Sequence, residues 1–103
     1  MRPVGLAILL VGAALARPLA ASEDDAATVR DYCRSEIAPT GQTCDCLLRQ
    51  FAKLSERQQA LVAAIIRDDA EAISDAREGL TDSDAAAADG FLKRGALLCR
   101  PSG

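Results

Sequence analysis

Residues 43–66 read TCDCLLRQFAKLSERQQALVAAII, and this stretch decides the fold class of the chain. Apolar residues recur in it every three or four positions, which is the period of an amphipathic α-helix. Ser55 is followed three residues later by Gln58, a capping-box pattern that predicts a new helix starting at Glu56. One bent but continuous helix through both halves is the alternative.

The same period continues on both sides of this stretch and predicts four helices in all. They cover about residues 23–38, 44–54, 56–78 and 82–99. The expected N-caps of the first, second and fourth helices are Ser22, Thr43 and Thr81. Gly79 is expected to close the third helix as a left-handed residue.

The fourth helix contains two glycines, Gly90 and Gly95, which are expected to lie in close contact with a neighbouring helix. Its expected apolar residues are Phe91, Leu92, Leu97 and Leu98. After residue 22 no segment alternates apolar and polar residues as a half-buried strand does. The predicted fold is therefore all-α, a small domain of three or four helices over residues 23–103.

Residues 1–22 follow the plan of a secretory signal peptide, with Arg2, an apolar run from Val4 to Ala16, and small residues up to Ser22. Cleavage is expected after Ala21 or Ser22 rather than after Ala16. The apolar run has 13 residues, short of the roughly 20 that span a bilayer, so no membrane anchor is expected after cleavage. The chain is rich in alanine and prefers arginine to lysine, a bias associated with GC-rich bacteria, and the expected location is the periplasm.

Four cysteines in a short exported chain predict two disulfides, and these cysteines are Cys33, Cys44, Cys46 and Cys99. A bridge between Cys44 and Cys46 would be too strained. If the first two helices form an antiparallel hairpin about residues 39–41, position 33 lies nearest position 46. This favours Cys33 with Cys46 and Cys44 with Cys99, while the pairing of Cys33 with Cys44 and of Cys46 with Cys99 stays open.

Cys44-Asp45-Cys46 also allows a metal site or a thiol-exchange site, because two thiolates could bind zinc or copper(I). The one-residue spacing is shorter than structural zinc sites use. The chain has no histidine, the commonest general base at neutral pH, so neither a catalytic residue nor a cofactor is predicted.

Charge argues against nucleic acid as a partner. Removal of residues 1–22 takes away Arg2 and Arg17, which leaves ten basic and fifteen acidic residues and a net charge of −5. The basic residues are interspersed with acids, whereas a phosphate-binding surface needs them clustered. One exception would be a stripe of Arg49, Lys53 and Arg57, which requires the second and third helices to be continuous.

The predicted function is that of a non-enzymatic binding, interaction or accessory protein whose partner is another protein of the cell envelope. Two alternatives remain open at this stage. One is metal or thiol handling through Cys44 and Cys46, and the other is carriage of a small apolar ligand between the helices.

Overall fold

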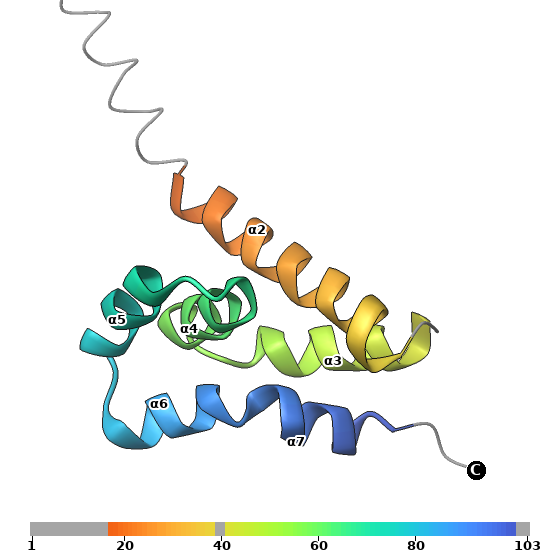
Figure 1. Cartoon of the computed structure of the whole chain (residues 1–103). Coiled ribbons are helices and arrows are strands. Elements are labelled where there is room, and N and C mark those ends of the chain that lie inside the picture. Colours follow the sequence, from red (N-terminus) through yellow and green to blue (C-terminus); the bar gives the residue numbers. More distant parts are fainter. Residues whose placement is uncertain (1–16, 39–40, 101–103) are drawn as a thin grey trace, which may run out of the picture.

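A computed structural model describes residues 17–38 and 41–100, and every regular element in these two ranges is helical (Figure 1). In chain order the elements are α2 (Arg17–Tyr32), the π-helix η1 (Cys33–Ile37), α3 (Gly41–Ala52), α4 (Glu56–Arg67), α5 (Ala70–Glu78), α6 (Asp82–Asp89) and α7 (Phe91–Leu98). No strand occurs in this part of the chain, so the prediction of an all-α fold is confirmed for it.

Helix α2 starts earlier than predicted. It begins at Arg17, so Ser22 lies inside the helix and the prediction of an N-cap there was wrong. The physical reason is that residues 17–22 contain no helix breaker beyond Pro18, and a proline is tolerated in the first turn. The predicted signal peptide falls largely on residues 1–16, which lie outside the described part of the chain.

The end of the first helix widens into the π-helical turn η1. The backbone N–H of Ala38 donates to the carbonyl of Cys33 at 2.8 Å, and Ala38 itself is extended. Helix α3 then begins at Gly41, two residues before the predicted cap Thr43, which is buried within the helix. The prediction that Thr43 is the N-cap of this helix was wrong, because the helix already begins at Gly41 and Thr43 lies in its first turn.

The break between α3 and α4 was predicted correctly. Gln58 N–H donates to Ser55 Oγ at 3.2 Å, and Ser55 N–H donates to Gln58 Oε1 at 3.0 Å, which completes a capping box. Because the helices are separate, Arg49 and Arg57 do not belong to one continuous helix. The basic stripe considered above does not form.

The predicted third helix is in fact two helices. Helix α4 ends at Arg67, Asp68 takes a left-handed conformation with φ 57° and ψ 43°, and Asp69 accepts from Ala72 N–H at 3.1 Å to cap α5. Short polar side chains suit both positions. Gly79 at the end of α5 has φ −94°, so the prediction of a left-handed residue there was wrong.

The predicted fourth helix is also divided. Thr81 caps α6 as expected, because its hydroxyl accepts from Asp84 N–H at 3.1 Å. Gly90 then interrupts the helix. The expectation of close packing holds for Gly95, since a methyl group there would overlap the side chain of Leu47 on α3.

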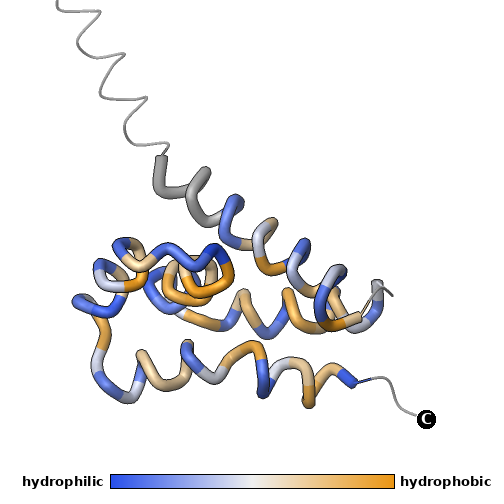
Figure 2. Tube along the Cα trace, in the orientation of Figure 1, coloured by the Kyte–Doolittle hydropathy of each residue, from blue (hydrophilic) through white to orange (hydrophobic). Residues whose placement is uncertain are grey.

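Helix α4 lies at the centre and packs against α2, α5 and α6, while α3 packs against α2 and α7. In Figure 1, α2 crosses above α3, and α6 with α7 run below it. Figure 2 shows that hydrophobic and hydrophilic residues alternate along each described helix with the spacing of an amphipathic helix. The rings of Phe51 and Phe91 meet edge to face with centroids 5.9 Å apart, which ties α3 to α7 in the core.

Candidate functional site

Both predicted disulfides are present, but their pairing differs from the favoured one. Cys33 is bonded to Cys44 with Cα atoms 5.7 Å apart, and Cys46 is bonded to Cys99 with Cα atoms 5.6 Å apart. The preference for Cys33 with Cys46 was therefore wrong. Two disulfides in so small a chain are typical of an oxidising, non-cytoplasmic compartment.

The π turn explains the pairing. It keeps Ala38 next to Cys33, and the sulfur of Cys44 lies 3.3 Å from the carbonyl oxygen of Ala38, so the first turn of α3 is level with Cys33. Residues two positions apart in an α-helix point in directions about 200° apart. Cys44 therefore points toward η1, whereas Cys46 points away from it and toward α7.

The Cys-x-Cys pair has no thiol in this structure, since all four cysteines are in disulfides. Zinc and copper(I) bind the thiolate form of cysteine, so a metal site here would first require reduction. Within residues 17–38 and 41–100, no three Cys, Asp or Glu side chains lie close enough together to bind one metal ion.

Helix α7 has an unusual outer surface. Phe91, Gly95 and Cys99 occupy its buried side, but Leu97 is 56% exposed and Leu98 is 72% exposed. The sequence pattern had assigned both leucines to the apolar stripe, and that assignment was wrong. Residues two positions apart on a helix point about 200° apart, so Leu97 points away from both Gly95 and Cys99.

Basic residues accompany the two leucines. Lys93 and Arg94 are exposed on the same helix, and Arg100 is exposed just beyond it. We call Lys93, Arg94, Leu97 and Leu98 the α7 outer face. From residue 90 to the end the chain has three basic residues and no acid, whereas residues 23–89 have fifteen acids and seven basic residues. The α7 outer face is therefore cationic and apolar on a molecule that is otherwise acidic.

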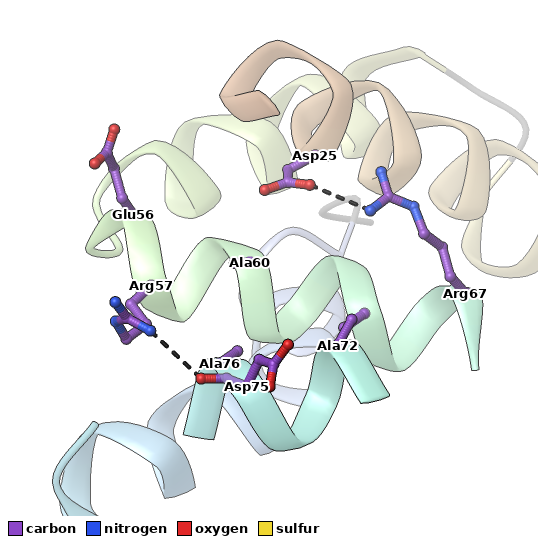
Figure 3. Close-up of a pocket in the computed structure, with 9 residues that line it drawn as sticks. Asp25, Glu56, Arg57, Ala60, Arg67, Ala72, Asp75 and Ala76 are labelled. Carbon is purple, nitrogen blue, oxygen red and sulfur yellow. Dashed lines mark hydrogen bonds and ion pairs between the residues drawn. The ribbon is translucent and has the colours of Figure 1, made fainter. Parts of the chain in front are cut away.

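A groove of about 560 Å³ lies between α2, α4 and α5 (Figure 3). Four alanines line it, and these are Ala60, Ala64, Ala72 and Ala76. Its five charged residues are Asp25, Glu56, Arg57, Arg67 and Asp75. An apolar ligand would have to desolvate these charges on entry, so the groove is poorly suited to the carrier function considered above.

Both arginines of the groove are engaged within the protein. Arg67 donates to Thr28 Oγ1 at 2.7 Å, to the carbonyl of Asp24 at 3.4 Å and to Asp25 Oδ1 at 3.4 Å. Arg57 donates to the carbonyl of Asp75 at 3.4 Å. These contacts attach the last residue of α4 to α2 and the first turn of α4 to α5.

Asp25 is the most enclosed acid of the groove. Its side chain is 14% exposed, and burial raises the pKa of this carboxyl above its ordinary value. Arg67 opposes the shift through its charge and hydrogen bond, and Asp24 adds to it. The negative charge of Asp25 is thus only partly compensated by the protein.

Comparisons with family models, with curated proteins and with solved structures find no match to this chain. Among the described helices, none is both long enough and apolar enough to span a membrane. The α7 outer face and the groove are therefore the two candidate sites of the described residues. Sequence reasoning missed both, although the adjacency of Leu97 and Leu98 was a signal for the first.

Proposed function

We propose that this chain is exported to the periplasm and acts there as a non-enzymatic binding protein, which docks on another protein of the envelope through the α7 outer face. The observation that carries the proposal is the exposure of Leu97 and Leu98 on a helix held in place by a disulfide. Burial of a leucine side chain contributes roughly 1.5–3 kcal/mol, so two leucines supply a useful part of a binding energy.

The position of α7 supports this function. Cys99 directly follows the helix and is bonded to Cys46 on α3, while Gly95 packs on Leu47. The surface is therefore rigid before a partner arrives, and little conformational entropy is lost on docking.

The charges indicate the chemistry of the partner. Lys93 is exposed four residues before Leu97 and favours an apolar pocket with an acidic rim, while Arg94 donates to the carbonyl of Ala87 on α6 and contributes positive charge only. They also disfavour docking onto surfaces of like charge, which gives selectivity among envelope proteins.

The test is the double variant Leu97→Ser with Leu98→Ser, compared with Ala86→Ser, which changes an exposed alanine on α6. Each protein would be cross-linked in the periplasm and purified, and its melting temperature would be measured. The proposal predicts that the wild type and Ala86→Ser retain a partner in fixed ratio, and that the double variant loses it without a lower melting temperature. A wild-type protein without a cross-linked partner, or a double variant that keeps it, would contradict the proposal.

A further inference from the structure

We infer that the groove between α2, α4 and α5 binds a protonated alkyl amine, either a free linear polyamine or the lysine side chain of a protein. This inference is independent of docking through the α7 outer face, because no residue of that face lines the groove. It rests on the shape of the groove, on its alanine lining and on which of its charged groups already have partners.

The shape suits a narrow alkyl chain. The volume of about 560 Å³ falls within the range of small-molecule sites. Ala76 is already buried, but Ala60 on α4 and Ala72 on α5 are half-buried and present their methyl groups, so the surface of the groove is apolar between the charges. Methylene groups of a ligand would bury these methyls.

The carboxylates are placed to hold ammonium groups. In Figure 3, Asp25 from α2 lies on one side of the groove and Asp75 from α5 lies on the other, with the α4 residue Ala60 between the two helices. Glu56 at the first turn of α4 is exposed and points away from these two carboxylates in Figure 3. A chain with an ammonium group at each end could reach the carboxylates on both sides.

The two arginines do not offer an alternative anion site. Their guanidinium groups already donate to oxygens of the protein, as described above, and a bound anion would also face Asp25 and Asp75. Within the described residues, Asp25 has its ion pair through Oδ1 alone, at 3.4 Å, and no ion pair of Asp75 or Glu56 is found. The acceptors that remain for a ligand are therefore carboxylate oxygens.

Enclosure makes Asp25 the strongest of these acceptors. A carboxylate that is 14% exposed has lost much of its hydration, and the guanidinium of Arg67 at 3.4 Å offsets this loss only in part. An ammonium group within hydrogen-bonding distance would offset that desolvation. It would also be held more tightly than by a fully solvated acid, because the effective dielectric constant is lower.

The experiment is isothermal titration calorimetry of the protein purified after expression of the full chain. The probes are spermidine, the lysine derivative Nα-acetyl-lysine methylamide, and 1,5-pentanediol as a neutral chain. We expect saturable binding of at least one amine and none of the diol. Tighter binding of spermidine would identify a polyamine site, and tighter binding of the lysine derivative would identify a lysine-recognition site.

Variants locate the binding in the groove. Asp25→Asn and Asp75→Asn should each weaken the amine at least tenfold, and Ala72→Leu should abolish binding by filling the groove. The matched control is Glu71→Gln, which neutralises an exposed acid on α5 outside the groove. Melting temperatures would verify that each variant is folded.

Two results would overturn the inference. One is that neither amine binds the folded wild type at millimolar concentration. The other is that Glu71→Gln weakens the amine as much as Asp25→Asn does, because the attraction would then be to net charge alone. The Leu97→Ser, Leu98→Ser protein should bind spermidine like the wild type, so failure here leaves docking through α7 unaffected.

Discussion

Cys46 on α3 and Cys99 after α7 are 53 residues apart in sequence, yet their Cα atoms are 5.6 Å apart and a disulfide joins them. This bridge closes the loop that contains α4, α5, α6 and α7. The other bridge, Cys33 to Cys44, closes only an 11-residue separation. The two disulfides therefore restrict the unfolded chain to different extents.

Removal of the two bridges should have unequal effects on stability. The chain-entropy relation gives about 4 kcal/mol for the Cys46–Cys99 bridge and about 3 kcal/mol for Cys33–Cys44. Urea denaturation of the Cys46→Ser, Cys99→Ser and Cys33→Ser, Cys44→Ser proteins would measure this difference. A larger loss from the shorter loop would indicate that native contacts, rather than chain entropy, control stability.

Replacement of Gly95 by alanine should destabilise the protein by about 1–3 kcal/mol, even though alanine is the better helix former. The added methyl would overlap Leu47, whose side chain is 1% exposed and has little room to move. Gly41→Ala is the matched control, because a methyl group there meets nothing within 4 Å. It should be neutral or stabilise by up to about 1 kcal/mol. Equal effects of the two changes on thermal unfolding would contradict the described contact between α7 and α3.

Asp68 provides a test of the joint between α4 and α5. Its φ of 57° is natural for glycine, so Asp68→Gly should stabilise the protein by up to about 1 kcal/mol. Asp68→Ala should destabilise it by about 1 kcal/mol, since alanine tolerates this conformation poorly. Both variants remove the same exposed carboxylate, and chemical denaturation should therefore resolve changes of opposite sign. Changes of the same sign would mean that the charge, not the backbone, is decisive.

The sequence predicted correctly those helix starts that depend only on residues close together in the chain. The capping box of Ser55 and Gln58 and the cap at Thr81 use only residues three positions apart, and both form as predicted. The α4–α5 joint was missed although Asp69 is a good capping residue, because the apolar period continues through it from Ile66 to Ile73. Helical periodicity alone does not reveal such a break.

The disulfide pairing, the groove and the exposed surface of α7 could not be predicted in this way, because they depend on contacts between distant parts of the chain. Pairing of Cys33 with Cys44 depends on the π turn, which has no distinct sequence signal here. The groove needs α2 to cross α4 near Asp25, and this crossing follows from tertiary packing. Exposure of Leu98 likewise depends on which face of α7 meets α3.

The charge of Asp25 should make stability depend on pH. Its folded pKa lies above the ordinary value, so the folded state binds the proton more tightly than the unfolded state does. The contribution of this group is favourable below the ordinary pKa of about 3.9 and is lost as pH rises through the raised folded pKa. Asp25→Asn should therefore have a higher melting temperature than the wild type at pH 7, and the difference should shrink in acid. A lower melting temperature of the variant at pH 7 would show that the ion pair with Arg67 dominates over desolvation.

The oxidised, cross-linked state of the four cysteines underlies the whole fold. Its most direct test is peptide mapping of protein recovered from the periplasm, alkylated without reductant and cleaved on the amino side of aspartates. Cleavage before Asp45 separates Cys44 from Cys46, so each bridge can be assigned. We predict one peptide, residues 31–44, that contains an internal bridge between Cys33 and Cys44, one peptide pair, residues 45–67 and 89–103, that is joined through Cys46 and Cys99, and no alkylated cysteine. Bridges from Cys33 to Cys46 and from Cys44 to Cys99, or alkylated Cys44 and Cys46, would contradict this prediction.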